Sequence, residues 1–181
     1  MALLKRLGLL IVGLMLLAGD ASAGLSEHRL KAVFLFNFSR FVEWPASAFT
    51  AADAPFVIGV FGRDPFGSDL DDVARGETVD GRRLLVRRVQ TVQDAAACQI
   101  LFIPESEQAN LDVILAALTR SSTLTVSDLD GAAQRGAMVR LVTDHDKIRL
   151  RINVESARAA GLTISSKLLR AAEIVTTGDG V

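Results

Sequence analysis

The sequence predicts a single α/β domain, a three-layer sandwich with a mostly parallel sheet of about six strands and a C-terminal β-hairpin. Along most of the chain, short apolar segments alternate with segments of helical periodicity, which is the β-α-β order of parallel sheets. The last two strand segments are separated only by the polar residues 144–146, as the strands of a hairpin are. Because no stretch rich in Pro, Gly or Ser divides the chain, we expect one domain.

The N-terminus has the pattern of a signal peptide. Lys5 and Arg6 precede an apolar run over residues 7–18, and small residues follow at Ala21-Ser22-Ala23. A basic segment, an apolar segment and small residues before the cleavage site are the three parts of a secretory signal. The run is shorter than the ~20 residues that a membrane-spanning helix needs.

We therefore expect cleavage between Ala23 and Gly24, with a signal peptide over residues 1–23 and a mature domain over 24–181. The mature domain should be exported to the periplasm and keep no integral membrane span. Cys98 is the only cysteine, so an intrachain disulfide is impossible even in that oxidising compartment. Its apolar surroundings favour a small buried side chain over a reactive thiol.

The elements of the mature domain follow from hydrophobic periodicity and capping residues. A helix is expected over residues 25–44, with Ser26 as N-cap and Pro45 as stop. The expected strands, each a short apolar or β-branched run, are 56–61, 84–89, 98–103, 124–126, 137–142 and 147–153. The expected later helices, capped at residues such as Asp64, Asn110 and Asn153, are 65–76, 111–118, 129–134, 154–160 and 167–175.

The composition excludes several classes of function. Lys and Arg number 20 against 21 Asp and Glu, a formal net charge of −1, so no overall charge favours nucleic acid or anionic lipid. One Cys and two His, without C-x-x-C or H-x-x-x-H spacing, exclude a zinc, haem or iron–sulfur site. We expect no nucleic acid partner, no metal and no cofactor.

Glycines after the first strand invite comparison with a phosphate-binding loop. Gly59, Gly62 and Gly67 match neither G-x-G-x-x-G nor the P-loop spacing, and Asp64 places a negative charge where a phosphate would bind. The segment is better explained as a turn followed by a helix N-cap. The expected fold is thus Rossmann-like without a nucleotide site.

No catalytic constellation emerges from the sequence. The candidate nucleophiles and bases are Ser127, Ser165, Ser166, Lys167, His28 and His145. Neither G-x-S-x-G nor S-x-x-K occurs, and a Ser that begins a helix already has a capping role. His145 between two aspartates of a hairpin tip is typical of a solvated turn. We expect no catalytic residues, and a hydrolase with an unrecognised Ser or Asp constellation is the weakest alternative.

The first helix carries more aromatic residues than one buried face accommodates. Phe34, Phe38 and Phe41 share one side of the helix and are expected in the core, whereas Phe36 lies roughly 100–200° away around the axis. An exposed aromatic residue beside Arg40 suits a protein interface. The candidate partner interface therefore consists of Phe36, Arg40 and Trp44, and ordinary burial of Phe36 is the alternative.

Several segments, taken together, resemble the YfiR-like family of exported regulatory proteins. Their order and spacing span about residues 30–172, and no single one is specific. The segments are Lys31–Phe38, Phe41–Pro45, Ile58–Gly67, Cys98–Ile103, Leu124–Asp128, Gly136–Val139, Ile148–Asn153 and Ala160–Leu169.

The resemblance implies a periplasmic α/β domain, usually dimeric and without enzymatic activity. The family's namesake binds and represses the periplasmic sensor domain of an inner-membrane diguanylate cyclase, and an outer-membrane lipoprotein releases it. The present sequence has only Cys98, so the disulfide control of the namesake cannot operate within one chain, and Gly136-Ala137 stands where Gly-Gly is common.

The leading hypothesis is thus a homodimeric periplasmic repressor of an inner-membrane signalling protein in cyclic-di-GMP signalling. The alternative from another class is a periplasmic small-solute binding component. Its ligand would lie at the carboxyl ends of the strands, near 62–64, 104–105 and 127–128.

Overall fold

The computed structural model describes residues 26–145 and 147–178. The expected cleavage site between Ala23 and Gly24 lies outside the described residues. None of the helices in the described part has the length and apolar character needed to cross a bilayer.

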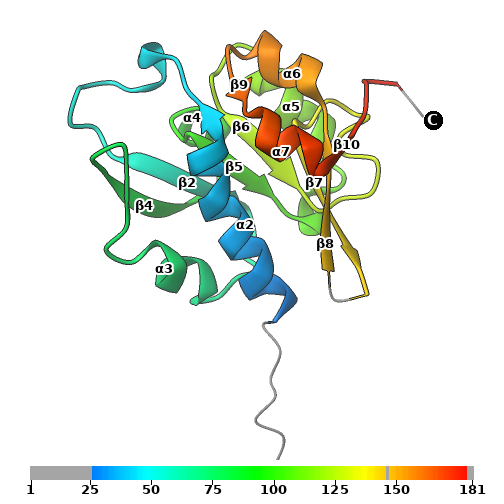
Figure 1. Ribbon diagram of the computed structural model, residues 1–181, viewed down its shortest axis with the longest axis horizontal. Coiled ribbons are helices and arrows are strands. Elements are labelled where there is room, and N and C mark those ends of the chain that lie inside the picture. The colour runs from blue at the N-terminus through cyan, green and yellow to red at the C-terminus, as the bar shows by residue number, and fades with distance from the viewer. Residues whose placement is uncertain (1–25, 146, 179–181) are drawn as a thin grey trace, which may run out of the picture.

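An eight-stranded mixed sheet forms the middle layer of the molecule (Figure 1). In spatial order its strands are β10 (Ala172–Ile174), β8 (Lys147–Ile152), β7 (Val139–Asp144), β6 (Leu124–Ser127), β5 (Ile100–Ile103), β2 (Phe56–Phe61), β4 (Arg82–Val89) and β3 (Thr78–Val79). β4, β2, β5, β6 and β7 run parallel, whereas β8 returns antiparallel to β7. The parallel sheet and the C-terminal hairpin are confirmed, and two short strands are added at the sheet edges.

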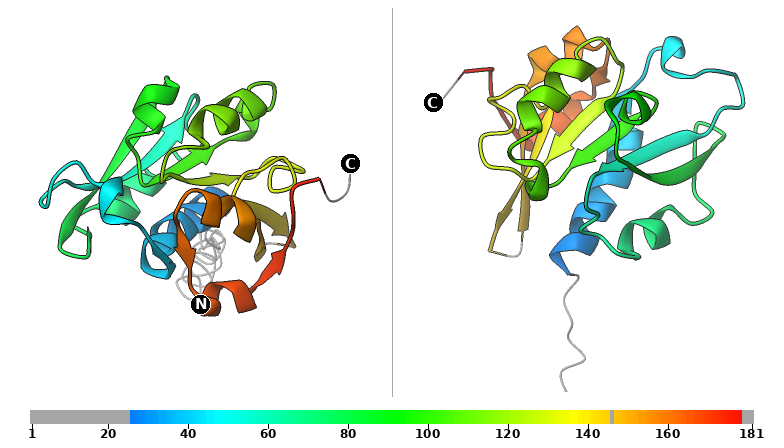
Figure 2. Two further views of the ribbon diagram at one scale, coloured as in Figure 1. Left: turned by 90° about the horizontal axis from the view of Figure 1, so that it is seen from above. Right: turned by 180° about the vertical axis from the view of Figure 1, so that it is seen from behind.

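Helices cover both faces of the sheet (Figure 2). The helices are α2 (Glu27–Phe41), α3 (Asp69–Ala74), α4 (Val92–Ala95), α5 (Leu111–Leu118), α6 (Val154–Ala159) and α7 (Ser166–Arg170). The face that carries α2, α3, α6 and α7 is called the front face, and α4 and α5 lie on the back face. Single 3₁₀ turns, η1 (Ala46–Ala48) and η2 (Glu105–Glu107), lie in the connections.

The core consists of two apolar clusters, one on each face of the sheet. In β2, Phe56, Ile58 and Val60 contribute to the front cluster, while Val57 and Phe61 contribute to the back cluster. Because successive side chains of a strand point to opposite faces, a strand buried on both faces needs a continuous apolar run. The three-layer sandwich is therefore the arrangement that the sequence predicts.

The segment after β2 differs from the prediction, because Asp64 does not cap a helix. Its carboxylate accepts a hydrogen bond from the Phe66 N–H at 2.7 Å and another from Arg88 Nε at 2.7 Å. The first bond closes a turn, which Gly67 continues with a φ of 56°. A left-handed residue interrupts helical geometry, so α3 begins only at Asp69.

Several element boundaries also differ. The first helix ends at Phe41 because Val42–Glu43 (β1) pairs antiparallel with Thr163–Ile164 (β9). The predicted helix over 167–175 ends at Arg170, and β10 follows it, because the backbone of β8 offers hydrogen-bonding groups to a neighbouring strand. Residues 129–134 form successive turns rather than a helix.

Candidate functional site

α2 carries several apolar side chains that the rest of the molecule covers only in part. Ala32, Leu35 and Phe38 are buried beneath the helix. On its remaining sides, α2 carries five half-buried apolar residues, which we call the α2 surface: Leu30, Val33, Phe34, Phe36 and Phe41. α2 lies between α3 and α7 on the front of the molecule, so this surface faces outward (Figure 1).

The structure modifies the expected division of the aromatic residues. Phe38 is buried, but Phe34 and Phe41 are only half-buried and pack at the margin of the front cluster. Phe36 is also half-buried against this cluster. The aromatic excess of α2 is therefore shared between core and surface.

Phe36 and Arg40 lie side by side on the flank of α2 that faces α3. The guanidinium carbon of Arg40 is 4.7 Å from the centre of the Phe36 ring, which is cation–π geometry. One nitrogen of the same guanidinium is 3.7 Å from a carboxylate oxygen of Glu77. These two predicted interface residues thus form one patch, in which an aromatic ring is bordered by an exposed charge.

Trp44, the third predicted interface residue, has a different setting. Its indole N–H donates to the carbonyl of Gln99 at 3.0 Å, and its ring meets Phe56 edge to face at 4.9 Å between centroids. Trp44 therefore anchors the segment after α2 to the amino ends of the strands. Tryptophan commonly combines apolar packing of its ring with a hydrogen bond from its indole N–H in this way.

The sequence did not indicate a charge cluster at the start of α2 that is centred on the buried Lys31. Lys31 Nζ lies 2.7 Å from Asp128 Oδ2 and 2.6 Å from Glu27 Oε1, and Thr143 donates to Glu27 at 2.7 Å. Burial acts to lower the pKa of Lys31, but the hydrogen bonds to both carboxylates outweigh it and raise that pKa. The hydrogen bonds that Glu27 accepts from Lys31 and Thr143 lower the pKa of Glu27. Lys31 could have indicated this cluster, because its helical spacing places it on the same side of the helix as the buried Leu35 and Phe38.

The carboxyl ends of the parallel strands are lined by carboxylates that already have partners. Gly62 lies against the carboxylate of Glu107, which fills the space that a β-carbon would need. Asp64 and Asp71 both bind the guanidinium of Arg88. Such groups would repel a phosphate. Of the segments where the small-solute alternative places its ligand, 62–64, 104–105 and 127–128, the first and last contribute Asp64 and Asp128 to ion pairs with Arg88 and Lys31.

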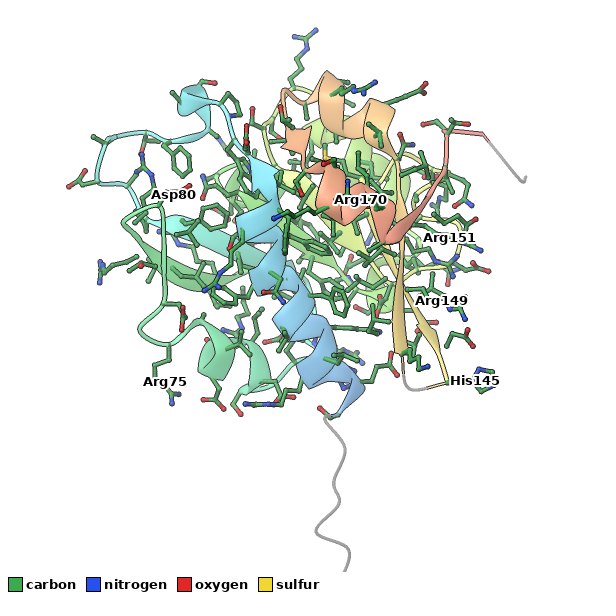
Figure 3. The ribbon with its side chains drawn as sticks, in the orientation of Figure 1. Arg75, Asp80, His145, Arg149, Arg151 and Arg170 are labelled. Atoms are coloured by element: carbon green, nitrogen blue, oxygen red, sulfur yellow. The ribbon has the colours of Figure 1, made fainter. Side chains whose placement is uncertain are left out.

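The candidate nucleophiles and bases do not form a catalytic group. Ser127 donates to the carbonyl of Ile103 at 2.7 Å, and Ser165 caps α7 by accepting from the Leu168 N–H at 3.3 Å. His145 projects into solvent at the tip of the β7–β8 hairpin (Figure 3). These residues have structural or solvent-exposed positions in different parts of the molecule.

Cys98 is buried, as predicted. Its side chain is 2% exposed, and its Sγ lies 3.4 Å from the carbonyl of Asp94. Burial raises the pKa of the thiol to about 11. Because the thiolate is the reactive species, the side chain acts here as a small apolar group.

Comparison with solved structures supports the fold. A crystal structure of a conserved domain protein from Vibrio cholerae O1 biovar El Tor strain N16961 superposes with a TM-score of 0.55 at 14% sequence identity. The match covers 82% of this chain but 60% of that chain, so the present chain spans less than two-thirds of that protein. The sequence has no significant match among curated proteins.

The sequence also matches a family model. The DUF4154 model, described as YfiR/HmsC-like, aligns with residues 28–173, which include every strand of the main sheet except the end of β10. A match to this family supports a role in the periplasmic regulation of diguanylate cyclase signalling in general. The match covers most of the chain and confirms the resemblance found in the sequence. The chain therefore belongs to the YfiR/HmsC-like family.

Proposed function

We propose that this protein binds the periplasmic sensor domain of an inner-membrane diguanylate cyclase through the α2 surface and represses that enzyme, without catalysis of its own. Family membership supports the regulatory role. The observation that carries the choice of surface is that Leu30, Val33 and Phe36, all apolar, are only partly buried on a helix in the middle of the front face. Partly exposed apolar residues grouped on one element are typical of protein interfaces.

The α2 surface also has the anatomy of an interaction site. Interfaces are rich in aromatic residues and arginine and poor in charge at the centre, with polar groups around the rim. Here Phe34, Phe36 and Phe41 supply aromatic area, and Arg40 with Glu77 supplies a charged border. A sensor domain that exposes a complementary apolar patch would cover the first group and leave the second in water.

The repression would operate by differential affinity. A regulator that binds only the inactive conformation of the cyclase shifts its population toward that state, and a switch from 1:99 to 99:1 needs a preference of about 10⁴. Self-association as a homodimer and release by an outer-membrane lipoprotein are further parts of the proposal. They are supported by the family resemblance alone.

The test uses Val33, which lies about 200° around the helix from the buried Leu35 and is partly exposed. In a strain that lacks the gene, cellular cyclic-di-GMP should rise, and the wild-type protein should restore the low level. Val33→Asp should fold normally but fail to restore it, because a charge at an interface centre prevents desolvation.

The matched control is Val113→Asp on α5, on the opposite face, where Val113 is 69% exposed. This variant should repress like the wild type. Unchanged cyclic-di-GMP in the deletion strain would contradict the regulatory proposal. Full repression by folded Val33→Asp would contradict only the choice of the α2 surface.

A further inference from the structure

A second feature of the molecule is a pocket at the amino ends of β2 and β5. It measures about 540 Å³, and we call it the Arg87–Arg120 pocket. Its walls come from the η1 segment, from Arg87 of β4, from residues 96–99 before β5 and from residues 120–122 after α5. The volume is within the range of small-molecule sites.

The walls of this pocket are held by specific hydrogen bonds. Gln99, a lining residue that is 4% exposed, accepts from the Val57 N–H at 2.8 Å and donates to the Ala48 carbonyl at 2.7 Å. Arg82 donates to two carbonyls of the loop before β2, and its guanidinium lies 3.9 Å above the Phe49 ring. The loop that forms one wall is thus tied to the sheet, and the pocket is preformed.

The charge of the pocket is positive. Arg87 and Arg120 both line it, and no Asp or Glu does. Neither guanidinium has a carboxylate within 4.0 Å among the described residues, in contrast to Arg29, Arg88, Arg135, Arg140, Arg149 and Arg151. Asp94, whose carboxylate accepts a hydrogen bond from the Thr91 hydroxyl at 2.6 Å, does not line the pocket.

Two unpaired arginines in one concave site favour an anion. A guanidinium offers paired N–H donors that match the oxygens of a phosphate or carboxylate, and a concave site concentrates its field. The lining adds hydroxyl donors at Thr50 and Ser122 and apolar surface at Phe49 and Pro55. The polar and apolar groups together suit a ligand with an anionic group and a carbon skeleton.

We infer that the Arg87–Arg120 pocket binds a small organic anion through a phosphate or carboxylate group. This inference is independent of the proposed repression, because it depends on a different part of the molecule and is tested by direct binding. It adds a ligand site to a domain whose strand carboxyl ends are closed by internal ion pairs.

The experiment is titration calorimetry of residues 24–181 in physiological salt with glycerol 3-phosphate and, separately, with succinate. Saturable one-to-one binding of at least one of them is expected, and the preferred probe identifies phosphate or carboxylate as the favoured group. Arg87→Gln and Arg120→Gln should each weaken binding by about tenfold. Both side chains are exposed, so thermal unfolding should be unchanged.

Arg170→Gln is the matched control, since Arg170 is exposed on α7, lies outside the pocket and makes no ion pair among the described residues (Figure 3). It removes the same charge and should leave the affinity within about twofold. The inference is overturned if neither probe binds at millimolar concentration. It is also overturned if Arg170→Gln weakens binding as much as the pocket variants, because the attraction would then depend on net charge alone.

Discussion

Lys31 and Asp128, which are 97 residues apart in the sequence, form an ion pair with Nζ and Oδ2 2.7 Å apart. The Lys31 side chain is 6% exposed and that of Asp128 is 16% exposed. The pair joins the first half of α2 to the segment that follows β6, one of the two central strands of the sheet. The orientation of the α2 surface therefore depends on a buried charge as well as on apolar packing.

Replacing one partner of this pair should be costly. Lys31→Met leaves the carboxylate of Asp128 without its cation, and the other oxygen of that carboxylate is already buried without a hydrogen bond. We expect a loss of about 3 kcal/mol in the free energy of unfolding, measured by urea denaturation.

The double variant Lys31→Met/Asp128→Leu should recover part of this loss, because it removes both charges. Lys167→Met, at an exposed position on α7, is the control and should change stability by no more than about 0.5 kcal/mol. Equal stability of Lys31→Met and the wild type would mean that Asp128 reaches water when its partner is removed.

The same cluster predicts a pH dependence. Hydrogen bonds from Lys31 and Thr143 depress the pKa of Glu27 in the folded state. The ionised Glu27 therefore stabilises the fold above its unfolded-state pKa, and this stabilisation is lost as the pH falls through its folded-state pKa. The raised pKa of Lys31 gives a contribution that is present below its unfolded-state pKa and lost only at strongly alkaline pH.

Glu27→Gln should therefore lower the melting temperature at neutral pH, and the difference from the wild type should shrink as the pH falls below the ordinary glutamate pKa of about 4.3 and through the lowered folded-state pKa of Glu27. Circular dichroism melts at a series of pH values measure this. A constant difference across the series would show that the charge of Glu27 does not contribute.

Cys98 should be chemically inert in the folded protein. Burial and a pKa of about 11 keep the thiol protonated at neutral pH, so a thiol reagent should label it only after denaturation. The melting temperature should be the same in reducing and oxidising buffer, and Cys98→Ser should leave repression intact. A functional Cys98-linked dimer in oxidising buffer would overturn this prediction.

The central strands could be predicted because the burial of each one is visible in its own stretch of sequence. Phe56–Phe61 and Ile100–Ile103 are buried along their whole length, so each is a continuous apolar run. β10 could not be predicted in this way. Ala172–Ile174 follows a short helix and extends only because β8 offers a free edge, and that edge is supplied by residues 150–152. Pairing between distant segments decides such cases.

The candidate sites show the same limit. The helical spacing of Phe36 and Arg40 was sufficient to place them together, and the structure does place them together. By contrast, Arg87 and Arg120 are brought into one pocket by two different crossovers of the parallel sheet. Nothing local in the sequence indicates that these two side chains share a cavity.

The last prediction separates the contribution of Phe36 to folding from its contribution to binding. Its ring is half-buried against the front cluster and lies beside Arg40. In Phe36→Asp, the carboxylate should reach water and can pair with Arg40 one helical turn away, so the domain should fold with reduced stability. Phe38→Asp, which buries an unpaired carboxylate in the core, should unfold the domain.

Circular dichroism and analytical ultracentrifugation of both variants, together with cyclic-di-GMP measurements, decide the outcome. We expect Phe36→Asp to be folded and to lose either self-association or repression, because a charge replaces aromatic area that a partner would cover. If the folded variant associates and represses as the wild type does, Phe36 is not part of the interface. The partner surface would then be confined to the half of α2 that carries Leu30 and Val33, which Val33→Asp tests separately.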